Sequence, residues 1–236
     1  MLRVKLKIRK PFIFINAAMS LDGKISTYER KQVRISNDLD MKRVDELRAS
    51  SDAILVGMNT VVSDDPKLNV KSEILRKIRV ERGMPENPIK ITLGNVDRMK
   101  LNSDFLDYGN SKKIIFTTTN SSPEKIEKIR EKATVYVMNE RIDLLEMLRI
   151  LHREGIRRIM VEGGGETNFE FLRENLVDEI YVAIAPVIFG GKTAPTLVDG
   201  IGFRHKNLIN LEFLEMSMLD DVIVFRYKVK NVRGYI

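Results

Sequence analysis

Segments typical of β-strands alternate with segments typical of α-helices along most of the chain, and this alternation limits the possible folds more than any other feature. Short apolar runs predict strands at residues 12–19, 52–57, 88–94, 112–118, 134–139 and 157–163. Amphipathic or capped runs between them predict helices at 36–51, 121–132, 142–155 and 168–175, with a short helical turn from Asn59. Strands that alternate with helices form a mainly parallel sheet covered on both faces. The predicted fold class is therefore α/β.

The end of the chain departs from this alternation. After an extended segment at 178–190, two long strand-like runs at 208–219 and 222–230 are joined by two aspartates. This pattern predicts an antiparallel hairpin at one edge of the sheet. Because no repeat, low-complexity tract or shift in composition divides the 236 residues, we expect a single domain over 1–236.

The first predicted helix has clear boundary signals. Ser36 or Asn37 is expected to cap its N-terminus, since both residue types accept hydrogen bonds from free backbone N–H groups. Its apolar residues are expected on one face: Leu39, Val44 and Leu47. The helix at 121–132 should start at Ser122 and Pro123, because proline favours the first helical position.

Basic residues dominate the N-terminus and precede an apolar run, as in a signal peptide. They alternate along the chain as in a strand: Arg3, Lys5, Lys7, Arg9 and Lys10. No small-residue cleavage site follows. We therefore interpret this stretch as a solvated edge strand.

Composition narrows the chemistry. The chain has no cysteine and only two histidines, His152 and His205, which argues against disulfides, thiolate nucleophiles and a metal site. No apolar run approaches the ~20 residues that span a bilayer, so we expect a cytoplasmic protein without membrane contact. The net charge of +7 suits a nucleic acid or a phosphorylated small molecule. Since the excess is spread thinly and no RNA-recognition motif occurs, we expect no nucleic-acid partner.

Three polar, glycine-containing segments follow predicted strands. They are NAAMSLDGKI at 16–25, GMNTVVSDDPKL at 57–68 and EGGGETN at 162–168. Ligands of open α/β sheets bind beyond the carboxyl ends of the strands. The three segments together therefore predict a ligand site.

The EGGGETN segment matches neither the Rossmann nor the Walker pattern, and a triple glycine alone is more often a tight turn. It nevertheless joins a buried strand to a helix start, where free N–H groups attract anions. Thr167 and Asn168 could cap that helix or contact the anion. Burying Glu162 unpaired would be costly, so it should bond backbone groups or a substrate.

The other two segments allow both a structural and a functional interpretation. Thr60 and Asp64 are four residues apart and would share a helix face. They could form a capped turn, with Asp65 held extended by Pro66, or contact a pyrophosphate and a ribose. For Asp22-Gly23, a chain reversal is a sufficient explanation.

These motifs, in this order, resemble the riboflavin-pathway pyrimidine reductases. The similarity rests on NAAMSLDGKI, LRASSDAILVGMNTVVSDDPKL (47–68), MVEGGGETN (160–168) and LVDEIYVAIAPVIFGG (176–191), and it extends from Phe12 to the final hairpin. The resemblance implies a dihydrofolate-reductase-like fold, a mixed, mainly parallel sheet with helices on both faces. It also implies NADPH-dependent reduction of a ribosylamino-pyrimidine phosphate to its ribitylamino form, and dimers are usual among relatives.

Bacterial relatives often add a zinc deaminase domain that needs paired cysteines. This chain has none, and so it resembles the stand-alone archaeal and fungal type. That type reduces 2,5-diamino-6-ribosylamino-4(3H)-pyrimidinone 5′-phosphate before deamination. The deaminated uracil analogue, another pterin-like substrate, and non-catalytic nucleotide or nucleic-acid binding remain as alternatives.

The resemblance assigns roles to individual residues. The implied cofactor contacts are Thr60, Asp64, Asn95, Thr117, Thr118, Gly164, Gly165, Glu166 and Thr167. The implied substrate contacts are Asn16, Ser20, Arg48, Leu68, Lys71 and Glu162, with Arg48 and Lys71 on the phosphate. Lys71 replaces an arginine of many relatives and would act as a point charge. The segment KQVRIS lacks the tryptophan that relatives often have there.

The implied chemistry is hydride transfer from NADPH, for which the protein supplies position and electrostatics. Glu162 and Asp22 are the candidate catalytic residues, either as proton donors or as groups that orient the substrate. Positioning alone could account for most of the rate.

Overall fold

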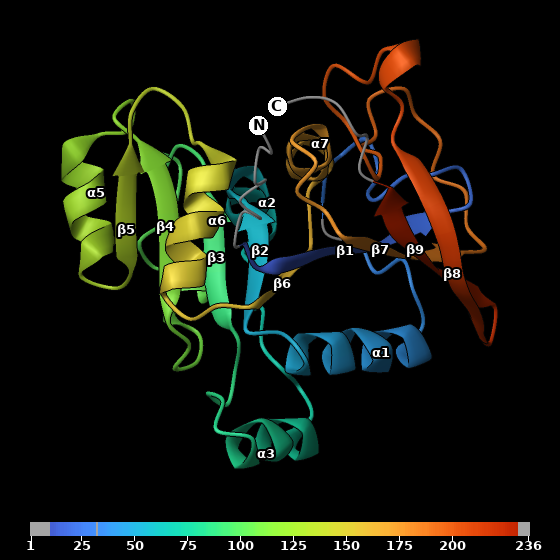
Figure 1. Cartoon of the computed structure of the whole chain (residues 1–236), viewed down its shortest axis with the longest axis horizontal. Coiled ribbons are helices and arrows are strands. Elements are labelled where there is room, and N and C mark those ends of the chain that lie inside the picture. Colours follow the sequence, from blue (N-terminus) through green and yellow to red (C-terminus); the bar gives the residue numbers. More distant parts are fainter. Residues whose placement is uncertain (1–9, 32, 231–236) are drawn as a thin grey trace, which may run out of the picture.

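All strands of the described residues belong to one sheet (Figure 1). The computed structural model describes residues 10–31 and 33–230, so the predicted basic N-terminal strand lies, apart from Lys10, outside the described residues. The strands are β1 (Phe12–Ser20), β2 (Ala53–Gly57), β3 (Ile89–Leu93), β4 (Lys113–Thr118), β5 (Thr134–Met138), β6 (Arg158–Val161), β7 (Glu179–Ala185), β8 (Asn210–Leu219) and β9 (Val222–Lys230).

The sheet order is β5-β4-β3-β2-β6-β1-β7-β9-β8. Neighbouring strands from β5 to β7 are parallel, whereas β9 is antiparallel to both β7 and β8. The predicted mixed, mainly parallel sheet with a C-terminal antiparallel hairpin is therefore confirmed.

Helices pack on both faces of the sheet, as predicted. They are α1 (Asp38–Ala49), α2 (Met58–Asp64), α3 (Glu73–Glu81), α4 (Asp104–Asp107), α5 (Pro123–Arg130), α6 (Leu144–Arg153) and α7 (Gly165–Arg173), with a short 3-10 helix at His205–Asn207. Alternate residues of β2 divide between two apolar clusters. Leu55 belongs to the cluster with α6 and α7, and Ile54 belongs to the cluster with α2, α4 and α5.

Local signals set several boundaries. Asn37 caps α1 and accepts a hydrogen bond from the Asp40 amide at 3.0 Å, and Pro123 occupies the first turn of α5. Leu39, predicted to share a helix face with Val44 and Leu47, is 37% exposed. Asp65 is left-handed rather than extended, with φ 43°, and its carboxylate accepts hydrogen bonds from the first amides of α4.

The sequence did not predict α3 or α4, and α7 begins three residues earlier than expected. Helix α3 has an apolar face too short to identify by periodicity alone. It is attached mainly by Arg79, which is 1% exposed and donates to the carbonyl oxygens of Ala49, Ser51 and Pro85.

The three strands that precede the predicted ligand segments are neighbours. β6 lies between β2 and β1 and is parallel to both. Their carboxyl ends therefore meet at one edge of the sheet, where the polar segments converge.

Candidate active site

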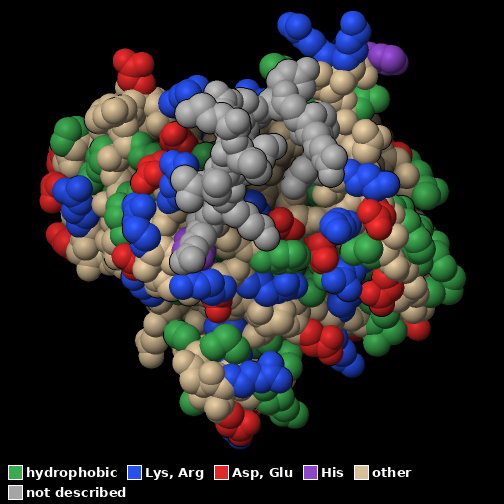
Figure 2. Space-filling view, in the orientation of Figure 1, with side chains coloured by type: hydrophobic (Ala, Val, Ile, Leu, Met, Phe, Trp, Pro, Cys, Tyr) green, Lys and Arg blue, Asp and Glu red, His purple; other side chains and the backbone are tan. Residues whose placement is uncertain are grey.

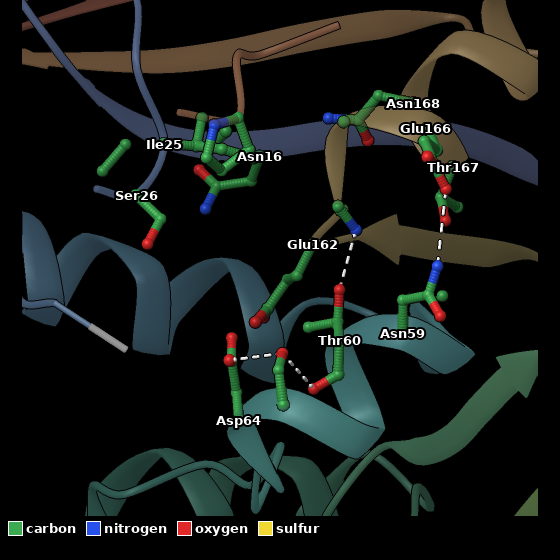
Figure 3. A pocket seen from close by; sticks show the side chains of 18 of the residues that line it. Asn16, Ile25, Ser26, Asn59, Thr60, Asp64, Glu162, Glu166, Thr167 and Asn168 are labelled. Atoms are coloured by element: carbon green, nitrogen blue, oxygen red, sulfur yellow. Dashed lines mark hydrogen bonds between the residues drawn. The ribbon is translucent and has the colours of Figure 1, made fainter. Parts of the chain in front are cut away.

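A cavity of ≈ 1390 Å³ lies along this edge. Its walls come from the ends of β1, β2, β3 and β6, from the start of α7 and from α1. Pockets for drug-sized ligands occupy roughly 300–1,000 Å³, so this cavity has room for two ligands side by side. Figure 3 shows its polar side chains converging from strands and helices that are far apart in the sequence.

Most of the predicted site residues line this cavity. They are Asn16, Arg48, Thr60, Asp64, Lys71, Asn95, Glu162, Gly164, Gly165, Glu166 and Thr167. The structure therefore brings together the ends of all three predicted segments.

The glycine loop is attached to the neighbouring β2–α2 segment through its backbone. The Gly57 amide donates to the Gly163 carbonyl oxygen at 2.8 Å, and the Gly164 amide donates to Thr60 Oγ1 at 3.0 Å (Figure 3). The peptide between Gly163 and Gly164 is cis. Thr60 thus accepts a loop hydrogen bond and retains its hydroxyl proton for another partner.

Glycines in this wall are required by close contacts within the protein. A Cβ atom at Gly165 would lie 2.5 Å from both the Thr196 carbonyl oxygen and Asp199 Oδ2. A Cβ atom at Gly57 would lie 2.2 Å from Thr167 Oγ1. Gly57 and Gly165 therefore let three chain segments meet at the start of α7.

The substrate residues implied by the resemblance include an ion pair. Arg48 Nε and Nη2 donate to the two Glu162 carboxylate oxygens at 2.7 and 2.8 Å. Arg48 Nη1 also donates to the Asn69 carbonyl oxygen at 3.1 Å. Both side chains are 15% exposed. Burial by itself would lower the pKa of Arg48, but the charge of Glu162 and its hydrogen bonds raise the pKa above its ordinary value.

Helix α1 turns a row of charged side chains inward, a feature that the sequence analysis missed. They are Asp40, Arg43, Asp45 and Arg48. Asp40 is 1% exposed and Asp45 is 7% exposed. The spacing of these charges, three, two and three residues apart, was the available signal. The prediction for this helix rested on its weak apolar pattern instead.

Asp45 fixes the segment that carries Lys71. Its two carboxylate oxygens accept hydrogen bonds from the backbone amides of Lys71 and Ser72 at 2.6 and 2.7 Å. The Lys71 side chain itself is exposed and lines the cavity. Helix α1 thus places two cations, Arg48 and Lys71, at the same end of the cavity.

Asp22 does not line the cavity and has a different environment from the one expected. Its carboxylate accepts hydrogen bonds from the Ser20 hydroxyl at 2.6 Å and from the amides of Phe189 and Gly190. These bonds, that of Ser20 first, lower the pKa of Asp22 to about 2. An acid of this strength is ionised near neutral pH, so the structure does not support Asp22 as a proton donor.

Four further predicted residues lie away from the cavity wall: Ser20, Leu68, Thr117 and Thr118. Leu68 is 2% exposed within the apolar cluster beside α2. Thr117 is fully buried, and its hydroxyl pairs with Ser121 Oγ at 2.7 Å. Neither side chain can contact a ligand in this arrangement.

The loop after β1 also lines the cavity, and the sequence analysis named none of its lining residues as a ligand contact. Its lining residues are Ile25, Ser26, Arg30, Val33, Arg34, Ile35 and Ser36. Arg98, after β3, and Asp199 are further polar lining residues that were not predicted. In the part of the chain that the structure describes, no group of three or more His, Asp or Glu residues could hold a metal ion. No helix there is long and apolar enough to cross a membrane.

A mainly parallel sheet with a cavity at the strand ends and at a helix N-terminus has the arrangement in which open α/β proteins bind ligands. Residues 11–225 match the family model described as the RibD C-terminal domain. The chain belongs to this family, and the resemblance to riboflavin-pathway reductases is confirmed.

Individual relatives cover nearly the whole chain. The 2,5-diamino-6-ribosylamino-4(3H)-pyrimidinone 5′-phosphate reductase of Archaeoglobus fulgidus is 42% identical over 198 residues, 84% of this chain and 90% of the relative. The protein of the same name from Methanothermobacter thermautotrophicus is 38% identical, covering 94% of this chain and 100% of the relative. Among solved structures, a pyrimidine reductase-like protein from Corynebacterium diphtheriae superposes with a TM-score of 0.82 at 21% identity, covering 94% and 93% of the two chains.

Proposed function

We propose that this protein reduces the ribosylamino side chain of 2,5-diamino-6-ribosylamino-4(3H)-pyrimidinone 5′-phosphate to the ribitylamino form, with NADPH as the reductant. The observation that carries the proposal is the 42% identity with an archaeal reductase of that name over nearly the full length of both chains. The size of the cavity supports it, since a dinucleotide and a phosphorylated substrate must be held together.

The wall at the glycine loop fits a nicotinamide dinucleotide. The first N–H groups of α7 have no intrahelical acceptor and attract anions such as a pyrophosphate. The hydroxyl of Thr60 lies beside them, 3.0 Å from the Gly164 amide. When bound, the cofactor would supply a hydride. The protein's part is to hold the reacting carbon atoms close together, at roughly 3–3.5 Å.

The wall at α1 fits the phosphorylated substrate. Lys71 and Arg48 supply positive charge at one end of the cavity, and Lys71 is exposed to it. Because both oxygens of Glu162 accept hydrogen bonds from Arg48, this carboxylate is held in one orientation. We assign Glu162 the role of orienting the pyrimidine rather than that of donating a proton.

The decisive experiment compares two substrates side by side. NADPH oxidation is followed at 340 nm with the 2,5-diamino substrate and with its deaminated uracil analogue. We expect a higher kcat/KM for the diamino compound. A clear preference for the uracil analogue would replace the proposed substrate, and no oxidation with either would refute the proposed activity.

NADPH rather than NADH is part of the same proposal. Arg98 lines the cavity at the carboxyl end of β3 and is exposed, where its charge can attract the 2′-phosphate. We expect Arg98→Ala to weaken NADPH binding about tenfold and to leave NADH binding unchanged, in keeping with the loss of one charge-assisted hydrogen bond. Fluorescence titration with both cofactors tests this, and an equal loss for both would remove the assignment.

We also propose a cytoplasmic homodimer whose residues 1–236 form a single reductase domain. Support for the single domain comes from the continuous sheet. Support for the dimer comes from the edge strand β8, where apolar side chains are exposed (Figure 2). The most exposed are Phe213 at 58%, Met216 at 55% and Met218 at 67%. Light scattering that gives the mass of one chain at micromolar concentration would contradict the dimer.

A further inference from the structure

The four residues at 69–72, named here the Lys71 segment, form neither a helix nor a strand, although they lead directly into α3. The backbone groups of such a segment must bond to side chains or to water. Helix α1 supplies two of the side chains. Arg48 donates to the Asn69 carbonyl oxygen, and Asp45 accepts hydrogen bonds from the last two amides of the segment. Helix α1 therefore holds the segment at both ends.

Arg76 of α3 and Asn87, which lies just before β3, hold the middle of the segment. Arg76 Nη1 donates to the carbonyl oxygens of Val70 and Lys71 at 3.0 and 2.7 Å. Asn87 Oδ1 accepts a hydrogen bond from the Val70 amide at 2.9 Å. Together with the contacts from α1, these bonds give a side-chain partner to every backbone amide and carbonyl group from the first carbonyl of the segment to its last amide.

This fixation is more than a connection between two helices requires. A connection at the surface can bond its backbone groups to water, whereas ordering long side chains costs conformational entropy. One of the partners, Asp45, is a carboxylate that is only 7% exposed. Lys71 is the one exposed residue of the segment, and its side chain lines the cavity. The arrangement therefore fixes the backbone from which this lysine reaches the cavity.

The segment also connects the two cations at this end of the cavity. Arg48 lines the cavity and donates to the first carbonyl oxygen of the segment, while Lys71 extends from it. A lysine side chain is long and flexible, and its ammonium group contacts an anion as a point charge. A fixed backbone limits the positions that the ammonium group can take relative to the Arg48 guanidinium group. A ligand with several anionic oxygens can then contact both cations together.

We propose that Arg76 and Asn87 are positioning residues, which hold the Lys71 segment so that Lys71 and Arg48 bind the 5′-phosphate of the substrate together. This inference rests on the proposed function and deepens it. Neither Arg76 nor Asn87 lines the cavity, so both act through the segment. The proposal also gives a role to α3, which lies apart from the sheet in Figure 1.

The first test removes each positioning contact and measures binding of the phosphorylated half of the substrate. Ribose 5-phosphate is titrated by calorimetry without cofactor. We expect its Kd to rise about threefold to tenfold in Arg76→Met and in Asn87→Ala, in keeping with the loss of hydrogen bonds to the segment. Asn87→Ala changes no charge, so a rise there is not a general electrostatic effect. The Kd of NADPH should stay within about twofold, and KM for the pyrimidine substrate should rise with little change in kcat.

Three control variants separate the carbonyl contacts of Arg76 from its charge. Glu86→Gln removes the ion pair between Glu86 and Arg76 Nε and leaves both carbonyl contacts in place. Lys77→Met removes an exposed positive charge from the same helix. Both variants should bind ribose 5-phosphate as the wild type does. Arg76→Lys keeps a donor that can reach a carbonyl oxygen, so it should bind ribose 5-phosphate more tightly than Arg76→Met.

The second test asks whether Arg76 acts through Lys71. In a Lys71→Met background, Arg76→Met should cause no further rise in the Kd of ribose 5-phosphate, because the ammonium group that Arg76 positions is already absent. Thermal denaturation of each variant measures stability separately. A purely structural role would lower the Tm without this dependence on Lys71.

Unchanged binding of ribose 5-phosphate in both Arg76→Met and Asn87→Ala would overturn the proposal. An equal rise in the Kd of NADPH would overturn it as well, since it would indicate general loosening of the protein. Additive losses from Arg76→Met and Lys71→Met would show that Arg76 does not act through Lys71. Failure of the wild type to reduce either pyrimidine would instead refute the proposed function. The titrations with ribose 5-phosphate, which require no turnover, distinguish these two failures.

Discussion

The two walls of the cavity are built from different parts of the polypeptide. The wall at α7 consists of backbone and glycine, with the Gly57–Gly163 and Gly164–Thr60 contacts holding adjacent loops together. The wall at α1 consists of long charged side chains, with the Arg48–Glu162 pair at its centre. The first wall suits a pyrophosphate, which any set of aligned N–H groups can bind. The second suits a substrate that must be held in one orientation.

This difference predicts how each wall responds to substitution. Substitutions in the wall at α7 are expected to act through steric clashes, and removal of the clashing atom should reverse their effect. Substitutions in the wall at α1 are expected to leave one charge unpaired. Removal of the second charge can then restore stability but not ligand binding.

The largest effect is expected from Arg48→Met. It leaves Glu162, whose side chain is 15% exposed, without its ion-pair partner, and it also removes a cation from the proposed substrate end of the cavity. Breaking a buried ion pair costs ~3–5 kcal/mol, and kcat/KM should fall at least about 100-fold. Urea denaturation and steady-state kinetics measure the two losses.

Glu162→Gln tests the charge of Glu162 separately, because it keeps the shape of the side chain. The double variant Arg48→Met with Glu162→Gln should recover much of the stability and none of the activity. Wild-type turnover and substrate affinity in Glu162→Gln would end the assignment of Glu162 as the orienting group.

Gly57→Ala should have the next largest effect, centred on the other wall. The added methyl group would lie 2.2 Å from Thr167 Oγ1, and overpacking of this kind costs ~1–3 kcal/mol. We expect weaker NADPH binding and a lower Tm. Because the next nearest atoms are Thr167 Cβ at 3.5 Å and the Gly163 carbonyl oxygen at 3.8 Å, which are ordinary contact distances, the double variant with Thr167→Ala should regain the Tm of the Thr167→Ala single variant. If Thr167→Ala does not restore the Tm, the clash is not the cause of the loss of stability in Gly57→Ala.

A smaller effect is expected from Asp45→Asn at the edge of the charged wall. The carboxylate holds the amides of Lys71 and Ser72, and an Asn side chain can accept only one of these two bonds. KM for the phosphorylated substrate should rise severalfold while the Kd of NADPH stays constant. Glu46→Gln, an exposed position on the same helix, serves as control, and an equal rise there would indicate a general charge effect.

Sequence patterns predicted the backbone wall much better than the charged one. Apolar runs and turn signals identified β1, β2 and β6, and the polar segments after them do meet at one edge. A glycine loop that follows a buried strand is recognisable because few other residues tolerate such close contacts. The order of the strands along the chain did not reveal that β6 lies between β2 and β1 in the sheet. Only the tertiary structure shows this position.

The charged wall could not be derived in the same way. Residues such as Asp40 and Asp45 look like solvated helix positions, because charged side chains are almost never buried unless they are paired. Asp40 pairs with Arg43 on the same helix, but Arg43 also contacts Asn16 on β1, and Asp45 accepts hydrogen bonds from the amides of Lys71 and Ser72. No local pattern reveals these contacts with other segments. Thr117 shows the opposite error. It lies at the carboxyl end of β4, as the cavity-lining residues lie at the ends of other strands, yet its side chain is fully buried and pairs with Ser121.

The smallest effect is expected outside both walls, at Asp22. Its carboxylate joins the loop after β1 to the loop after β7 through the amides of Phe189 and Gly190. Because the pKa is lowered from 3.8 to about 2 in the folded protein, its stabilising contribution is present above pH 3.8 and is lost as the pH falls toward 2. Asp22→Asn should therefore lower the midpoint of urea denaturation slightly at pH 7. The difference from the wild type should shrink progressively below pH 4. Turnover at pH 7 should stay close to that of the wild type, because neither wall contains this side chain. A large loss of kcat with an unchanged midpoint of urea denaturation would instead show that Asp22 acts in catalysis, although it belongs to neither wall.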